Sequence, residues 1–176
     1  MIQLNVDWVK GGTLLELEDI YKLYVNDLYR YLFSLSKDHF ISEDLAQEVF
    51  YRSYLVLDDY EIKHIKAWLF KVAYNTFIDY QRKNKRIVVG NEVSEKVDGS
   101  METPEKLVLE KEAFKLLLED LNTLNEKEKQ AVLLCDLHGL HYQEASDILD
   151  VKLNTFKSYL SRGRKRVKER MSKDDR

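Results

Sequence analysis

Residues 142–167 carry two amphipathic helical patterns separated by a short break, and this stretch constrains the fold more than any other. In the first pattern Ala145, Ile148 and Leu149 recur at the spacing of one helix face. The segment from Asp150 to Leu153 interrupts that period. The second pattern again places its apolar residues on one face, at Phe156, Leu160, Gly163 and Val167. We therefore expect two short helices that pack together through these faces.

The second helix presents hydrogen-bond donors on the side opposite its apolar face. Asn154 is a suitable N-cap, because its side-chain oxygen can accept from a free backbone N–H one turn ahead. The exposed side carries hydroxyl and basic side chains, namely Lys157, Ser158, Ser161, Arg162 and Lys165. Such a helix pair is typical of a helix-turn-helix, whose second helix enters the major groove of DNA. A helical hairpin with a solvated basic face is the alternative interpretation.

Composition predicts a helical protein of the cytoplasm. The length of 176 residues allows one or two small domains, and only 6 glycines and 1 proline favour helices over a turn-rich β protein. A single cysteine excludes an internal disulfide framework. The sequence has no apolar run of about 18 residues, which a transmembrane helix requires. Residues 1–12 lack the pattern of a signal peptide.

The formal net charge of −3 conceals two basic clusters. Lysines and arginines outnumber acids after Leu137, and they form a second cluster at Arg82, Lys83, Lys85 and Arg86. The acidic residues gather from Glu16 to Glu61 and from Glu92 to Glu128. This distribution predicts two nucleic-acid contacts and a protein-binding face.

The stretch from Ser42 to Leu57 is the candidate protein-binding helix. Ser42 is a suitable N-cap, and acids in the first turn favour the helix dipole. One side is the expected core face, with Leu45, Val49, Phe50, Ser53 and Val56. The other side combines acids with an aromatic ring and a leucine, and it suits a basic, partly apolar partner: Asp44, Gln47, Glu48, Tyr51 and Leu55. A solvated polar face is the alternative.

The stretch from Ile65 to Lys83 predicts a helix with apolar residues on most sides. Its core stripe is Ile65, Leu69, Val72, Ala73, Thr76 and Tyr80. Another face mixes aromatic, amide and charged side chains, namely Trp68, Lys71, Asn75, Asp79 and Arg82. Such a face suits single-stranded nucleic acid, because rings stack on bases and cations hold the backbone. A central bundle helix with a basic end is the alternative.

Residues 87–104 lose the helical period and hold the only proline, which is typical of a linker between domains. Helical spacing resumes over residues 105–121. Asn125 with Glu128 forms a plausible capping pair for a helix ending near Leu137, and Gly139 suits its C-cap.

The sequence carries no catalytic or metal-binding signature. Neither a P-loop, a nucleophile elbow nor a GxGxxG pattern is present, so no cofactor and no enzyme activity are expected. The four histidines lack metal-ligand spacing with cysteine or acids, so no metal site is expected. Cys135 lies on an apolar helix and is expected to be structural.

Three segments together resemble one family. SEDLAQEVFYRSY (42–54), IKAWLFKVAYNTFIDYQRKNKR (65–86) and LNTLNEKEKQAVLLCDLHGLHYQEASDILDVKLNTFKSYLSRGRKRVKE (121–169) occur in this order, with the linker between the second and third. They are similar to the ECF (extracytoplasmic-function) group of bacterial sigma factors, the smallest members of the sigma-70 superfamily. The resemblance spans most of the chain from about Glu18 to Arg170.

The resemblance implies an all-α fold of two small helical domains joined by a flexible linker. Residues 1–86 would form a sigma region-2-like domain that binds core polymerase and the −10 element. Residues 87–104 would be the linker, and residues 105–176 a region-4-like helix-turn-helix domain that binds the −35 element. The implied function is to bind core RNA polymerase and direct promoter recognition, −10 strand opening and transcription initiation.

The resemblance also assigns residues. The residues assigned to core-polymerase binding are Asp44, Gln47, Glu48 and Phe50. Tyr51 lies on the same helix and is assigned to this contact as well. Those for the single-stranded −10 element lie in the loop at 58–66 and the helix after it: His64, Lys66, Trp68, Lys71, Asn75, Asp79, Arg82 and Lys83. Those for the −35 duplex are Thr155, Lys157, Ser158, Ser161, Arg162, Arg164 and Lys165.

The implied partners are core RNA polymerase, through its β′ clamp helices and β flap, promoter DNA, and a membrane-bound anti-sigma factor. The chain itself is not expected to insert into a membrane. It departs from the family in the turn, with Asp150 where Gly is usual, Lys152 where many members have Ser, and Asn154 where many have Gly. A helix-turn-helix regulator that acts without polymerase and a helical interaction adaptor remain the alternative hypotheses.

Overall fold

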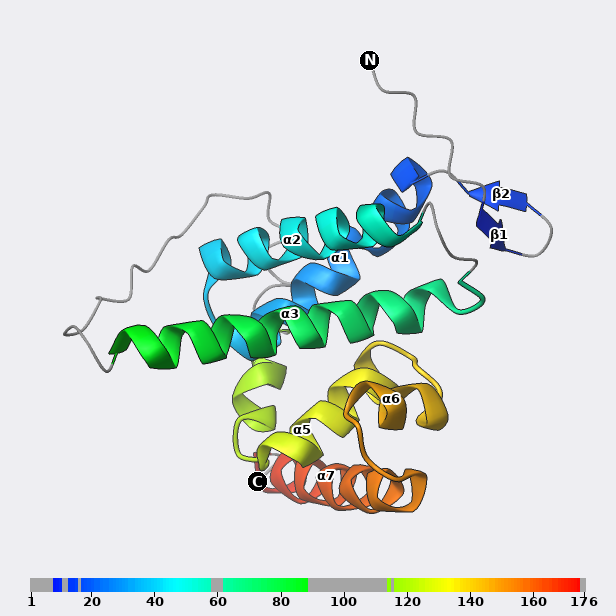
Figure 1. Cartoon of the computed structure of the whole chain (residues 1–176). Coiled ribbons are helices and arrows are strands. Elements are labelled where there is room, and N and C mark those ends of the chain that lie inside the picture. The colour runs from blue at the N-terminus through cyan, green and yellow to red at the C-terminus, as the bar shows by residue number, and fades with distance from the viewer. Residues whose placement is uncertain are drawn as a thin grey trace, which may run out of the picture. The chain divides into compact units, whose positions relative to one another are not determined.

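Helices dominate both of the units into which the chain divides, Met1–Val97 and Asp98–Arg176 (Figure 1). The computed structural model describes residues 8–10, 13–15, 17–57, 62–88, 114 and 116–174. The all-α fold class is confirmed. One small addition is an antiparallel hairpin of β1 (Trp8–Lys10) and β2 (Thr13–Leu15), with Trp8 opposite Leu15. The sequence patterns do not predict this hairpin.

The described residues of the first unit form a three-helix assembly. It contains α1 (Leu17–Ser36), α2 (His39–Leu57) and α3 (Ile65–Val88), and each helix contacts the other two. The core between them consists of side chains with no exposed surface, among them Ile20, Leu28, Tyr31, Leu32, Val49, Leu69, Phe70 and Ala73. The rings of Tyr31 and Phe70 lie with their centroids 5.1 Å apart. Burial of these apolar faces stabilises the helices, as their spacing predicts.

Helix α2 follows a tight turn after α1 and begins three residues earlier than the sequence predicts. Lys37 adopts a left-handed φ of 58°, which ends α1. Asp38 then caps α2, because its Oδ1 accepts from the N–H of Ile41 at 2.9 Å. The prediction that Ser42 is the N-cap is wrong. Ser42 is buried inside α2, where its hydroxyl bonds to the carbonyl of Asp38 and to Ser36.

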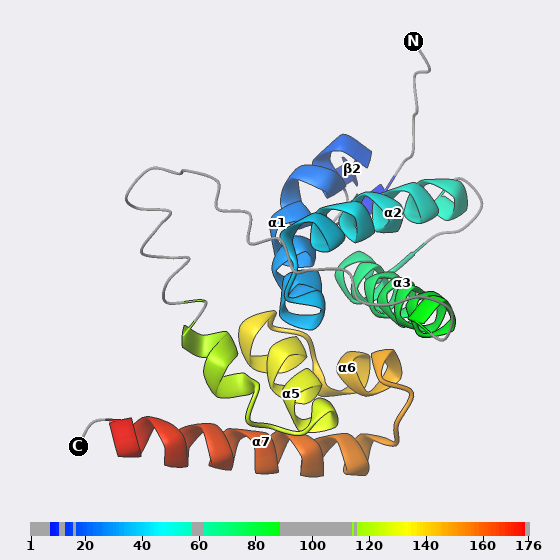
Figure 2. The ribbon, with the colours of Figure 1, turned by 90° about the vertical axis from the view of Figure 1, so that its left-hand side faces the viewer.

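The second unit is built around one long helix. It contains a helical stretch at 116–121, α5 (Glu126–Val132), a π-helical turn η1 (Leu133–Leu137), α6 (Tyr142–Ile148) and α7 (Leu153–Asp174). Helices α5 and α6 both pack along α7 (Figure 2). The core side chains are 2% exposed or less, and they include Leu121, Leu133, Leu134, Ile148, Phe156 and Leu160.

Two predicted caps in this unit are confirmed. Asn125 Oδ1 accepts from the N–H of Glu128 at 2.9 Å and caps α5. Gly139 has φ 67°, and its N–H donates to the carbonyl of Cys135 at 3.1 Å. Glycine tolerates this left-handed conformation at the end of η1 without strain.

The turn between α6 and α7 depends on Asp150, which adopts φ 52°. The expected apolar face of α6 is confirmed, since Ala145, Ile148 and Leu149 are at most 3% exposed. The prediction that Asn154 caps α7 is wrong, because the helix already begins at Leu153. The N–H of Phe156 donates to the carbonyl of residue 152 at 2.9 Å, so Asn154 lies inside the first turn.

Helix α3 continues to Val88, two residues into the expected linker. Three segments with sequence-based predictions lie outside the described residues: the rest of the linker (89–104), the first part of the helix expected at 105–121, and residues 58–61 of the expected loop. None of the described helices combines the length and the apolar character that a bilayer crossing requires.

Candidate protein and nucleic-acid interfaces

One side of α2 is open to solvent and acidic. Asp44 and Gln47 are exposed, Glu48 is half-buried, and Tyr51 and Leu55 expose 59% and 54% of their surface. We call these five residues the α2 stripe. Their spacing of three or four residues places them on one face. The stripe therefore combines carboxylates with two large apolar side chains that the first unit leaves uncovered.

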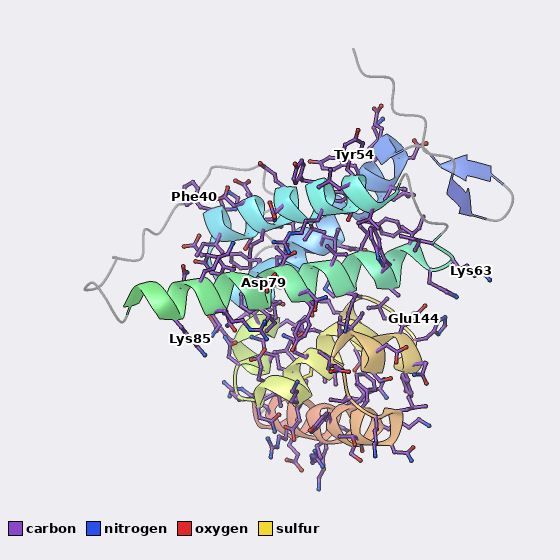
Figure 3. All side chains as sticks on the ribbon, in the orientation of Figure 1. Phe40, Tyr54, Lys63, Asp79, Lys85 and Glu144 are labelled. Carbon is purple, nitrogen blue, oxygen red and sulfur yellow. The ribbon has the colours of Figure 1, made fainter. Side chains whose placement is uncertain are left out.

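Phe40 extends this face by one turn. It precedes Asp44 by four residues and is 57% exposed, and it stands at the start of α2 in Figure 3. The sequence interpretation missed Phe40 because it began the helix at Ser42. The same spacing rule, continued one step backwards, would have found it.

Phe50 does not belong to the exposed face. Its side chain is 8% exposed, and its ring packs on Tyr21 of α1 with centroids 4.7 Å apart. Phe50 thus supports the packing of α1 on α2 and stands apart from the other predicted polymerase contacts. The spacing of Val56 predicts a core position, but 38% of its surface is exposed.

Arg52 joins α2 to α3. Its Nε donates to Glu48 Oε1 at 2.7 Å, and its Nη1 donates to Asp79 Oδ2 at 3.2 Å. The hydrogen bond to Glu48, with a further one to Asp79, raises the pKa of Arg52 above its ordinary value. Asp79, labelled on α3 in Figure 3, also lies 3.9 Å from Arg82. Glu48, a predicted polymerase contact, and Asp79, a predicted −10 contact, therefore bind the same arginine.

The remaining predicted −10 residues lie at the start of α3 and along it. Trp68 and Lys71 are half-buried, whereas Asn75, Arg82 and Lys83 are exposed. Before the helix, exposed His64 accepts the N–H of Trp68 on its carbonyl at 3.0 Å. Lys66 is half-buried and lies 3.8 Å from Asp27 of α1. Figure 3 places Lys63 before α3 and Lys85 toward the far end of the helix.

All seven predicted −35 residues lie on α7 with exposed side chains: Thr155, Lys157, Ser158, Ser161, Arg162, Arg164 and Lys165. The opposite side is buried as expected, with Phe156 and Leu160 at most 2% exposed and Gly163 buried. Helix α7 therefore has the apolar inner face and the polar outer face that its sequence predicts.

Two arginines of α7 are held by one buried carboxylate of α5. Glu128 is 1% exposed, and it accepts from Arg162 Nε at 3.0 Å and from Arg166 Nη1 at 2.7 Å. Charge-assisted hydrogen bonds of this length are among the stronger ones in proteins. The sequence interpretation assigned Glu128 only to a cap and Arg162 only to DNA, so it missed this contact.

Two more arginines are held at the flanks of α7. Arg164 donates to both carboxylate oxygens of Asp136, with a shortest distance of 2.6 Å, and to the hydroxyl of Tyr142 at 3.2 Å. The hydrogen bonds to Asp136 raise the pKa of Arg164 above its usual range. Arg170 lies 2.7 Å from Asp120. All four arginines on α7 thus already have acidic partners within their own unit.

Metal binding and the single cysteine are the remaining chemistry to locate among the described residues. These residues contain no group of three or more His, Cys, Asp or Glu side chains that could hold a metal ion. Cys135 is half-buried, and burial raises the pKa of its thiol to about 11. At neutral pH the thiol is therefore protonated and weakly reactive.

The chain is similar to known RNA polymerase sigma factors. The chain matches the family described as "Sigma-70 region 2" over residues 20–87 and "Sigma-70, region 4" over residues 114–167. The ECF RNA polymerase sigma factor SigM of Bacillus subtilis is 39% identical over 157 residues, which cover 86% of this chain and 93% of that protein. SigW of the same species is 26% identical over 181 residues, with 97% of each chain covered.

Solved structures give the same result for the fold. The sigma factor RpoE from Bartonella quintana, in complex with the anti-sigma factor NepR, matches with a TM-score of 0.69 and 27% identity. The match covers 88% of this chain and 96% of that chain.

Proposed function

The chain belongs to the ECF group of sigma-70 RNA polymerase sigma factors, and we propose how its two units divide the work of promoter recognition. An ECF sigma factor binds core RNA polymerase and directs transcription initiation at its promoters. We assign polymerase and −10 binding to residues 1–86, a linking role to 87–104, and −35 binding to 105–176. The observation that carries this division is that the region 2 and region 4 matches fall in separate compact units.

The α2 stripe docks on the clamp helices of the polymerase β′ subunit. Exposed Tyr51 and Leu55 supply apolar contact area, and the carboxylates of Asp44 and Glu48 supply charge. Interfaces commonly combine aromatic anchors with complementary charge, which fixes orientation and speeds association. Phe40 adds a second exposed aromatic ring at the start of the same face.

The outer face of α3 captures the −10 element as a single strand. Trp68 offers a ring for stacking, exposed Asn75 offers an amide for a base edge, and Arg82 with Lys83 offers positive charge for the backbone. Unstacking a base costs about a few kcal/mol, so a face that binds only the melted strand shifts the equilibrium toward the open promoter. No bond chemistry is required of the sigma factor itself.

Helix α7 enters the major groove of the −35 element, and the unit positions the polymerase along the duplex. Seven exposed residues are assigned to this contact: Thr155, Lys157, Ser158, Ser161, Arg162, Arg164 and Lys165. Each good base contact adds about 1–3 kcal/mol of discrimination against a wrong base.

The factor acts in the cytoplasm and is controlled by an anti-sigma factor. The similar Bartonella sigma factor is known in complex with an anti-sigma factor, which supports this assignment. We extend the resemblance to a membrane-bound partner that covers both units and releases the factor on a signal. The β flap of the polymerase is the expected contact of the second unit.

The test separates polymerase docking from DNA binding. Asp44→Ala combined with Tyr51→Ala removes a carboxylate and an exposed ring from the α2 stripe without touching the Arg52 contacts. Glu18→Ala combined with Leu23→Ala removes a carboxylate and an exposed apolar side chain from α1, and it is the matched control. We expect the first pair to weaken the Kd for core polymerase at least about tenfold, with run-off transcription lost in proportion. Equal affinity of both pairs for core polymerase would refute the docking assignment.

A further inference from the structure

Asn154 occupies an exposed position in the first turn of α7. Its side chain does not cap the helix, because α7 begins one residue earlier. The contact it makes is through the backbone, where its carbonyl accepts from Ser158 Oγ at 3.1 Å. Within the described part of the chain, no hydrogen bond engages the Asn154 carboxamide. The amide donor and acceptor of this residue are therefore open to a ligand.

Asn154 begins a polar ridge along the outer side of α7. The ridge residues follow at intervals of three or four and are all exposed: Asn154, Ser158, Ser161 and Lys165. They lie on the side opposite buried Phe156 and Leu160. In helix-turn-helix proteins the N-terminal residues of the second helix reach the base edges. Asn154 and Ser158 are therefore in the position where sequence is read.

The flanks of α7 carry arginines, but acids of the same unit already hold them. Glu128 binds Arg162 and Arg166, and Asp136 binds Arg164 through both oxygens. A bidentate contact from one of these arginines to guanine would first have to give up such a partner. The short side chains of the ridge have no comparable competition, which favours them for base readout.

We propose that Asn154 reads an adenine in the upstream duplex element through a pair of hydrogen bonds, an inference that rests on the −35 function proposed above. A carboxamide donates and accepts side by side. That pattern matches the N7 acceptor and the N6 amino donor that adenine presents in the major groove. Guanine presents two acceptors at the same place and does not match. A glycine at this position would have no side chain to form this contact.

The experiment measures base preference with the complete holoenzyme. Core polymerase and the full chain are bound to a promoter library in which the upstream element is randomised, and bound and unbound pools are sequenced. The wild-type factor is expected to prefer adenine at one position. Asn154→Ala should reduce that preference about tenfold, the loss expected for one bidentate base contact, and leave the other positions within about twofold. Asn26→Ala, an exposed helical asparagine of the first unit, is the control.

A second measurement replaces the selected adenine with 7-deazaadenine, which lacks the N7 acceptor. The wild-type holoenzyme should lose affinity for this duplex, whereas Asn154→Ala should not distinguish it from the normal one. Equal weakening of all sequences by Asn154→Ala would indicate a phosphate contact and overturn the proposal, as would an unchanged base preference. A wild-type holoenzyme that selects no upstream sequence would instead refute the −35 function itself. Thermal unfolding of both variants at the wild-type temperature excludes a folding defect.

Discussion

Replacement of Glu128 by glutamine should destabilise the second unit by about 2 kcal/mol. The variant keeps the shape of the side chain and removes the charge that Arg162 and Arg166 share. Hydrogen bonds to charged groups contribute about 1.5–3 kcal/mol each. Both arginine side chains are about half exposed, at 52% and 51%, so solvent screening places the expected loss toward the lower part of the summed range. An amide oxygen can still accept one of the two bonds, which reduces the loss further.

The matched control is Glu169→Gln, which removes the same charge from an exposed pair. Glu169 lies 3.9 Å from Lys165, and the two side chains are 59% and 78% exposed. Exposed pairs of this kind contribute about 0–1 kcal/mol, so the control should unfold within about 0.5 kcal/mol of the wild type. The comparison therefore isolates burial of the carboxylate from loss of a negative charge.

The assay uses the uneven distribution of tryptophan. Both tryptophans, Trp8 and Trp68, belong to the first unit, whereas helical circular dichroism reports on both units. Glu128→Gln should lower the melting temperature of the dichroism transition by about 8–16 °C, as a 2 kcal/mol loss does in a domain of this size. Tryptophan fluorescence should change much less. If Glu128→Gln and Glu169→Gln melt together by both probes, the buried carboxylate does not stabilise α7 and the reasoning fails.

Two further substitutions test the packing of the second unit. Gly163→Ala should cost about 1–3 kcal/mol in urea unfolding, because the added Cβ would lie 2.8 Å from Val132 Cγ2 and 3.1 Å from the carbonyl oxygen of Glu128. An unchanged free energy of unfolding would mean that α5 and α7 can move apart far enough to admit the added methyl group without loss. Asp150→Gly should raise the melting temperature by relieving up to about 1 kcal/mol of strain at φ 52°. A decrease would show that the aspartate side chain itself supports the turn.

Sequence patterns predicted the features that depend on residues close together in the chain. The apolar faces of α6 and α7 follow from a spacing of three or four residues, and the cap of α5 joins Asn125 to a residue three positions on. The two wrong caps, Ser42 and Asn154, have suitable side chains for a cap. The helices nevertheless begin before them, at His39 and Leu153, and in α2 the side chain of Asp38 already caps the first turn.

Contacts between distant residues were out of reach of these patterns. Arg162 and Arg166 lie 34 and 38 residues from Glu128, and Arg52 lies 27 residues from Asp79. A pattern of charges along one helix cannot distinguish an arginine that faces a partner from one that faces an acid of its own fold. Phe50 is a different case, because its spacing predicts the core position that its packing on Tyr21 confirms, whereas the family resemblance assigns it to polymerase binding.

The acids that hold the arginines of α7 also bear on how such a factor diverges after gene duplication. Substitutions at Asn154, Ser158 or Ser161 change exposed side chains, and the one hydrogen bond these side chains make within the described part of the unit runs from Ser158 Oγ to the carbonyl of Asn154. Substitutions at Arg162, Arg164 or Arg166 remove a partner of Glu128 or Asp136 and weaken the fold as well. A duplicated copy can therefore come to recognise new promoter sequences through substitutions in the ridge, while the arginines on the flanks of α7 are retained. Selection for a new regulon and selection for a folded protein then act on different residues of the same helix.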